Sequence, residues 1–97
     1  MLDPKTLAIG DRIRILSVPE SDLRQREDEL ATGGEMPGHT ANSIERIIDQ
    51  TPVVSICRLD DDGSVWYETR IVGVNGREEY HSLIVYNDDT WERVVDQ

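Results

Sequence analysis

The sequence predicts a mainly β domain with a helical insertion, which places it in the α+β class. Residues 9–18 and the stretch from residue 53 onward are rich in β-branched and alternating apolar side chains, as is typical of strands. Residues 20–51 lie between these parts and carry helix caps and apolar residues at helical spacing. The length of 97 residues predicts one domain that covers residues 1–97.

The first strand is expected within residues 9–18. Ile13 and Ile15 alternate there with two arginines, and this pattern places the apolar side chains on one face of a half-buried strand. Proline cannot donate to a sheet ladder, so we expect Pro19 to end the strand.

The first helix of the insertion is expected to begin near Ser21, whose hydroxyl is a suitable N-cap, and to end at Gly33–Gly34. Its only large apolar residues are Leu23 and Leu30. Such a narrow apolar stripe favours a helix that lies on the surface of the domain. Residues 20–38 contain few apolar side chains. The alternative is therefore that this segment folds only when it binds a partner.

A second helix is expected after a loop at Met36–Gly38. Asn42 and Glu45 have the spacing of a capping box, and Pro52 ends the helix. Three isoleucines share one face of this helix: Ile44, Ile47 and Ile48. The second helix therefore has the stronger apolar face of the two.

Strands and tight turns fill the rest of the chain. Four strands are expected, at residues 53–59, 65–74, 79–86 and 91–95. The turns between them are Asp60–Gly63, Asn75–Gly76 and Asn87–Thr90. Asn-Gly is the strongest short hairpin signal, because both residues tolerate the left-handed conformation that a tight hairpin turn requires.

The order of these elements resembles the SH3-like small barrel, a five-stranded fold with a long loop after its first strand. The string Gly-Asp-Arg-Ile-Arg-Ile at residues 10–15 is similar to the Gly-Asp-x-Val-x-Val opening strand of many small barrels. The string at residues 62–68, Asp-Gly-Ser-Val-Trp-Tyr-Glu, is similar to a stretch of SH3 and Tudor domains. The resemblance implies that residues 20–51 are an enlarged RT loop.

The chain departs from signalling SH3 domains at the residues that form their ligand groove. It lacks the Ala-Leu-Tyr-Asp-Tyr string after the first strand and the Pro-x-x-Tyr string in the last turn. A full Tudor aromatic cage cannot be assigned either. The resemblance therefore implies a fold and neither polyproline binding nor any other specific function.

The charge is strongly acidic, with 20 Asp and Glu against 10 Lys and Arg and a net charge of −10. Such a field repels phosphate backbones, which disfavours direct nucleic-acid binding and favours a basic protein partner. No apolar run is long enough to cross a bilayer, and no secretory signal is visible. Cys57 is the single cysteine, so no internal disulfide is expected and a reducing cytoplasm is the expected location.

Acidic residues and tryptophans define the candidate site. On the SH3-like plan, loops on one face would gather a partner-binding set: Glu27, Asp28, Glu29, Asp60, Asp61, Asp62, Trp66, Asp88, Asp89 and Trp91. Carboxylates and indole rings on that face would receive Lys or Arg side chains. Trp66 shares a strand face with Glu68 and Arg70, which favours its partial exposure. The alternative is that the turns are acidic because they are solvated, and that both tryptophans belong to the core.

No catalytic, cofactor or metal site is predicted. His39 and His81 are far apart in sequence and lack metal-ligand spacing, and Cys57 is more typical of a small buried side chain than of a nucleophile. The Asp60–Gly63 turn lacks the spaced ligands of a calcium loop.

The leading hypothesis is a non-catalytic module that binds a basic protein, and one version is an immunity or inhibitor protein that covers the active site of a toxin nuclease. The second hypothesis is a structural domain that self-associates through an apolar patch or an edge strand. The third is a small enzyme or ligand-binding domain whose inserted helices cover His39 or His81.

Overall fold

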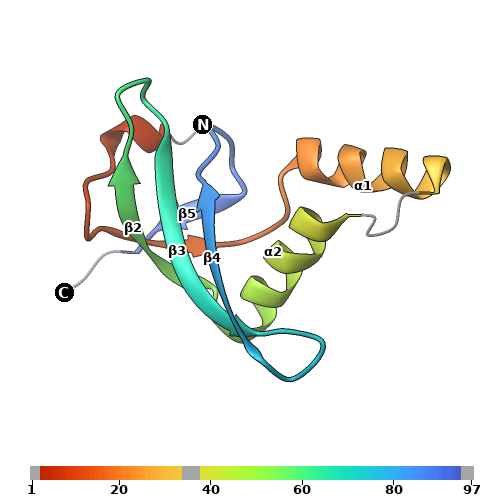
Figure 1. Cartoon of the computed structure of the whole chain (residues 1–97). Helices are drawn as coiled ribbons and strands as arrows, with labels where there is room; N and C mark the ends of the chain where they lie inside the picture. The colour runs from red at the N-terminus through yellow and green to blue at the C-terminus, as the bar shows by residue number, and fades with distance from the viewer. Residues whose placement is uncertain (1–2, 34–37, 95–97) are drawn as a thin grey trace.

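The computed structural model describes residues 3–33 and 38–94 (Figure 1). Its elements follow the order η1 (Pro4–Thr6), β1 (Arg12–Ile15), α1 (Glu20–Thr32), α2 (His39–Gln50), β2 (Val53–Leu59), β3 (Val65–Val72), β4 (Glu78–Ile84) and β5 (Trp91–Arg93). Five strands and two helices confirm the α+β class. The expected loop at Met36 and Pro37 and the expected strand end at Val95 lie outside the described residues.

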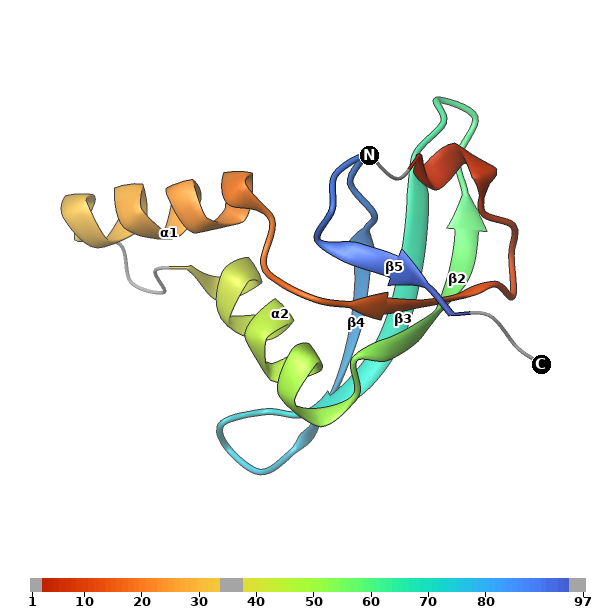
Figure 2. The same cartoon turned by 180° about the vertical axis from the view of Figure 1, so that it is seen from behind.

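The strands form one antiparallel sheet in the order β4-β3-β2-β1-β5. Strands that are consecutive from β1 to β4 pair with one another, and β5 returns to pair with β1 on the other side. Strands β4 and β5 are the two edges and do not pair with each other within the described residues, so the sheet is not closed there. Figures 1 and 2 show that the sheet is strongly twisted and that both helices lie to one side of it.

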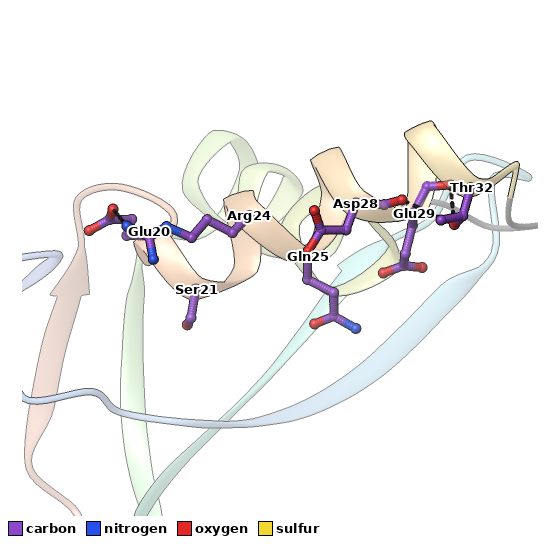
Figure 3. Close-up of a pocket in the computed structure, with 7 residues that line it drawn as sticks. All are labelled: Glu20, Ser21, Arg24, Gln25, Asp28, Glu29 and Thr32. Atoms are coloured by element: carbon purple, nitrogen blue, oxygen red, sulfur yellow. Dashed lines mark hydrogen bonds and ion pairs between the residues drawn. The ribbon is translucent and has the colours of Figure 1, made fainter.

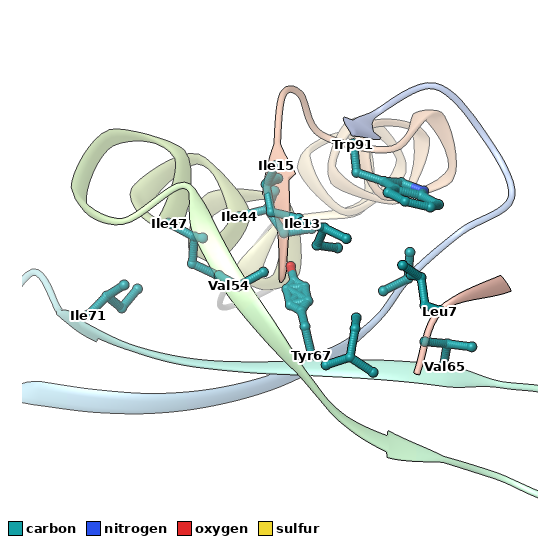
Figure 4. Close-up of a cluster of buried hydrophobic side chains, with 12 residues drawn as sticks. Leu7, Ile13, Ile15, Ile44, Ile47, Val54, Val65, Tyr67, Ile71 and Trp91 are labelled. Atoms are coloured by element: carbon teal, nitrogen blue, oxygen red, sulfur yellow. The ribbon is translucent and has the colours of Figure 1, made fainter. Parts of the chain in front are cut away.

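The core lies between the inner face of the sheet and α2 (Figure 4). Alternating residues of β1, β2 and β3 point into it, as their burial patterns show. Helix α2 adds Ile44 and Ile47, while Ile48 packs at the margin, which confirms the predicted apolar face. The fully or nearly fully buried apolar side chains are Leu7, Ile13, Ile15, Ile44, Ile47, Val54, Ile56, Val65, Tyr67, Ile71, Val85 and Trp91.

Both predicted helix caps are wrong. Helix α1 begins at Glu20 after Pro19, so Ser21 lies inside its first turn and makes no capping bond. Helix α2 begins at His39, one turn before the predicted cap, and its N-cap is Gly38 with a φ of 69°. A Cβ on Gly38 would lie 2.3 Å from side-chain atoms of Arg26, so close packing against α1 as well as the left-handed backbone requires glycine there.

Helix α1 is attached mainly through polar contacts. Arg26 donates to Asn42 Oδ1 at 3.0 Å and pairs with Glu45 on α2. Leu30 is 63% exposed, and the one buried residue of the helix is Asp22. In Figures 1 and 2, α1 lies beside α2 and extends away from the sheet, which agrees with the surface position that its sequence predicts.

The ends of the helical insertion are tied to the sheet next to each other. Ile15 at the end of β1 donates its backbone N–H to Pro52 O at 2.8 Å. Gln50, the last residue of α2, bonds both backbone groups of Val72 through its side-chain amide, each at 2.8 Å. The Gln50 amide thus acts like a strand residue beyond the start of β2 and fixes the end of α2 against β3.

Candidate functional site

The turn at residues 60–63 joins β2 to β3, and its first carboxylate is held by the protein's own side chains. Trp66 donates its indole Nε1–H to Asp60 Oδ2 at 2.9 Å, and Arg58 pairs with Asp60 Oδ1 at 2.9 Å. The Arg58 guanidinium lies 4.5 Å from the centroid of the Trp66 ring. Trp66 is half-buried on the outer face of β3, which confirms its predicted partial exposure. Arg58 occupies the position over the ring that was expected for a partner's cation.

The other two acids of this turn have different roles. Asp62 Oδ1 accepts a hydrogen bond from the Ser64 backbone N–H at 2.9 Å, and this bond is the main reason that the pKa of Asp62 is lowered. Asp61 is exposed. Gly63, with a φ of 89°, closes the turn, and a Cβ there would lie 3.1 Å from Lys5 Cε. One of the basic side chains therefore lies against the turn and partly offsets its charge.

The second acidic turn, between β4 and β5, holds Asp88 in a structural role. Asp88 Oδ1 accepts hydrogen bonds from the Thr90 backbone N–H at 3.0 Å and from its hydroxyl at 2.5 Å. Asp89 is exposed. Trp91 is 3% exposed and donates its indole N–H to Tyr86 O at 2.7 Å. The expectation that Trp91 faces a partner is therefore wrong, because its ring fills the core.

The acids of α1 do not join those of the turns. Glu27 and Asp28 are exposed and Glu29 is half-buried. In both Figure 1 and Figure 2, α1 extends from one side of the sheet while the β2–β3 turn lies at the far side. The expected gathering of all these carboxylates on one face is not what the structure shows. It has one acidic surface on α1 and another around the two turns.

An open hollow lies along α1 (Figure 3). Its lining residues all belong to that helix: Glu20, Ser21, Arg24, Gln25, Asp28, Glu29 and Thr32. Arg24 pairs with Glu20 at 2.6 Å, one turn earlier, and Asp28 and Glu29 make no ion pair with any residue that the structure describes. Because a single helix supplies every wall, the groove is open and does not enclose a small molecule.

Asp22 is a buried acid that the sequence analysis did not single out. It lies in the first turn of α1, is 7% exposed, and its Oδ2 has no hydrogen-bond partner within the described residues. Burial raises the pKa of this carboxyl, because removal from water disfavours the charged form. An unpaired, buried carboxyl of this kind destabilises a fold unless something else bonds to it.

The Asp22→Asn variant is expected to gain stability over wild type as the pH rises. Since the pKa of Asp22 is raised by folding, the folded protein binds this proton more tightly than the unfolded chain does. Wild type therefore loses stability above the ordinary aspartate pKa of about 4, and asparagine removes that loss. We expect the free energy of unfolding of the variant, measured by urea unfolding, to increase relative to that of wild type as the pH rises from 4 to 7.

Asp28→Asn is the matched control for this prediction, because Asp28 lies on the same helix and is exposed. Its stability relative to wild type should change little over the same pH range. A difference between Asp22→Asn and wild type that stays constant from pH 4 to pH 7 would contradict the prediction.

A second polar cluster lies between α2 and the inner face of β4. Glu79 Oε1 contacts His81 Nε2 at 3.1 Å and Arg46 Nη2 at 3.5 Å. The hydrogen bond to His81, helped by Arg46, lowers the pKa of Glu79. The His81 side chain is 14% exposed, so it is largely removed from solvent. A Cβ on Gly73 would lie 2.2 Å from Glu79 Oε2, which indicates that the cluster is packed and structural.

The described residues do not assemble a nucleophile and base. No hydrogen bond joins the free, half-buried Cys57 to either histidine, and His39 is exposed. Neither His39 nor His81 lines the hollow along α1. Within residues 3–33 and 38–94, no group of three or more His, Cys, Asp or Glu side chains is arranged to hold a metal ion.

Among the helices of residues 3–33 and 38–94, none is long and apolar enough to cross a membrane. No protein-family model matches this chain, and no curated protein or solved structure matches it significantly.

Proposed function

We propose that this chain is a non-catalytic binding protein that presents carboxylates to a basic protein partner. The observation that carries the proposal is the division of its acids into two groups. Ion pairs hold Glu20, Glu45 and Glu79 to arginines of the same chain. Other acids are exposed and make no ion pair within the described residues: Glu27 and Asp28 on α1, and Asp61 and Asp89 in the turns.

This division matters because a paired carboxylate offers little to a partner, whereas an exposed one attracts cations over a Debye length. With a net charge of −10, the whole molecule also draws a basic partner toward it before contact. The open groove on α1 supplies a surface whose acids can pair with Lys or Arg side chains at short range.

We further propose that the fold is a relative of the SH3-like barrel with an enlarged RT loop. The strand order β4-β3-β2-β1-β5, with the chain leaving the sheet after β1 and returning at β2, supports this proposal. The order of elements along the chain is also the one on which the sequence resemblance rests, whereas the sheet is not closed within the described residues. The fold by itself implies no partner.

A concrete version of the proposal is an immunity or inhibitor protein that covers the basic active site of a toxin nuclease. Such a protein acts by occlusion and needs acidic surface rather than catalytic groups. The free thiol of Cys57 fits a reducing compartment, so we propose that the protein acts in the cytoplasm.

Self-association through an edge strand is the competing proposal, and the residues of that edge disfavour it. Strand β4 is an edge of seven residues, and the exposed Val72 and Val74 lie at the end of β3 and in the β3–β4 hairpin. Its first two residues, Glu78 and Glu79, are acidic. Charged side chains on an edge hinder pairing with a second copy, because the like charges of the two copies would be brought together.

A pull-down from host lysate at low and at high salt tests the proposal directly. A basic protein retained at low salt and released by salt is the expected result, because exposed charge pairs are screened. Single reversals of the exposed acids, Asp28→Lys, Asp61→Lys and Asp89→Lys, should then identify the surface that faces it. We expect the reversal at the contact to slow association roughly tenfold at low salt and to flatten its salt dependence.

Asp49→Lys is the matched control, because it changes the net charge by the same amount at an exposed acid on α2. Asp88 is a poorer test position, since its carboxylate holds the Thr90 backbone. Association rates that are equal in all four variants and wild type would contradict a specific acidic interface. Failure to retain any basic protein at either salt would overturn the proposed function.

A further inference from the structure

Strand β4 is an edge of the sheet, and its backbone groups alternate between β3 and the open side. It pairs with β3, and no strand of the described residues pairs with it on the other side (Figure 1). Val85 donates its backbone N–H to Val65 O at 2.8 Å. Gly73 donates to Arg77 O at the same distance. These bonds set the phase of the ladder, so the residues of β4 that turn both N–H and C=O outward are Glu78, Tyr80, Ser82 and Ile84.

These outward backbone groups make no hydrogen bond to any described residue. The chain covers the corresponding groups at the end of β3, because the Gln50 amide bonds both backbone groups of Val72. Helix α2 packs on the inner face of the sheet and reaches β4 through the pair between Arg46 and Glu79. A row of unpaired donors and acceptors along a strand is a template on which one more strand can form.

The side chains of β4 leave this edge regular. The register with β3 is continuous from Glu78 to Ile84, and β4 contains no proline. Proline residues and bulges are common devices that block an edge strand. On the outer face, Tyr80 donates its hydroxyl to Glu68 Oε2 at 2.7 Å. Because Glu68 belongs to β3, the Tyr80 side chain leans over the sheet and away from the free edge.

The edge is protected by charge alone, and that charge is acidic. Glu78 opens the strand, and its ion pair with Arg70 at 3.3 Å joins two exposed side chains, so it contributes little. At the other end, β4 leads into the turn that carries the exposed Asp89. With a net charge of −10, a second copy of the chain is repelled and a basic segment is attracted. Charge complementarity therefore selects the occupant of the edge.

We infer that the free edge of β4 receives an extended segment of the basic partner, which adds to the sheet as an antiparallel strand. The inference rests on the proposed function, because a partner must supply the segment. Antiparallel pairing continues the pattern of this sheet and is slightly the more stable arrangement. Backbone hydrogen bonds supply affinity in this mode, and alternate side chains supply specificity. Lys or Arg opposite Glu78 and Tyr80 would pair with the carboxylate and lie against the ring.

The test uses the intact chain and a blocked peptide, acetyl-Ile-Val-Thr-Val-Lys-Thr-Lys-amide, whose last lysine lies opposite Glu78 in the antiparallel register. Hydrogen exchange followed by NMR reads the edge directly. In the free protein, we expect the outward amides of Tyr80 and Ser82 to exchange fast, while β3 protects those of Glu79 and His81. The peptide should slow the exchange of the outward amides, with a Kd on the order of millimolar.

Modified peptides supply the matched controls. Methylation of the backbone nitrogens of the central threonine and the first lysine removes N–H groups that face β4, and it should weaken binding at least about tenfold. Methylation of the two valines changes N–H groups that face away, and it should leave binding unchanged. Glutamate in place of both lysines should also weaken binding about tenfold. Equal binding of the two methylated peptides, or of the acidic and basic peptides, would overturn the inference.

Protein variants test the same edge from the other side. Ser82→Pro removes an outward N–H and no hydrogen bond to β3, so it should abolish the protection by the peptide. Ser82→Ala is the matched control and should bind as wild type does. If Ser82→Pro does not fold, the methylated peptides still decide the question. Slower exchange of the outward amides when the chain alone is concentrated would show that a second copy occupies the edge, and would overturn the inference. No change in exchange at a large excess of peptide would overturn it too.

Failure of this inference is distinguishable from failure of the proposed function. The peptide experiment needs no natural partner, whereas the pull-down depends on no particular strand. A basic protein retained equally by wild type and Ser82→Pro would show that strand addition is wrong and that the acidic interface stands. Protection by the peptide, with no basic protein retained from lysate, would support the edge as a strand-binding site and overturn the proposed function.

Discussion

Truncation of Ile47 to alanine is expected to lower the free energy of unfolding by roughly 2–5 kcal/mol. Ile47 is 0% exposed and lies on the face of α2 that packs against the sheet. Its removal takes apolar contacts from the core and leaves a cavity that the surrounding strands can fill only in part. A loss of this size is a large share of the stability of a small domain, which is about 5–15 kcal/mol.

Urea unfolding followed by circular dichroism measures this loss. Leu30→Ala is the control. Leu30 is a helical residue of the same size as Ile47, but it lies on α1 and is 63% exposed. We expect that control to change the free energy of unfolding by no more than about 0.5 kcal/mol. Equal losses in the two variants would show that α2 is not packed on the sheet.

Trp91→Ala is expected to cost roughly 3–5 kcal/mol, since its ring is 3% exposed and its indole N–H bonds to Tyr86 O. Trp91→Phe keeps most of the packing but loses that hydrogen bond, so a cost of about 1 kcal/mol or more is expected. Trp66→Ala should cost less than Trp91→Ala, because Trp66 is half-buried on the outer face of β3.

Thermal unfolding of the three variants separates a core role from a partner-binding role. Tryptophan fluorescence adds an independent test: in Trp66→Phe the remaining indole should emit at shorter wavelength than the indole in Trp91→Phe. A Trp91→Ala variant that is as stable as wild type would contradict the core assignment. It would return Trp91 to the set of candidate partner-binding residues.

Much of the fold followed from local patterns. The alternation of Ile13 and Ile15 with arginines identified β1, and the spacing of Ile44 and Ile47 identified the buried face of α2. Local patterns did not predict where the helices start, because the start of α2 depends on contact between Gly38 and Arg26 from the other helix. Capping preferences describe one helix at a time and carry no information about such contacts.

The site was predicted less well, for a related reason. An aspartate in the first turn of a helix is ordinarily solvated and favourable there, so nothing local marks Asp22 as buried. Its burial depends on where α1 docks, which is a tertiary property. Trp91 lies in a strand of three residues, which is too short for alternation to indicate the buried face. By contrast, the long alternation of β3 placed Trp66 on the outer face.

The adjacent ends of the insertion have an evolutionary consequence. Because Ile15 bonds to Pro52, the chain leaves the sheet and returns to it at nearly the same place. Helix α2 supplies core residues and is tied to β3 by Gln50, so it cannot be exchanged freely. Helix α1 places no apolar side chain in the core. Substitutions on its outer surface are therefore expected to leave the packing of the sheet and of α2 unchanged.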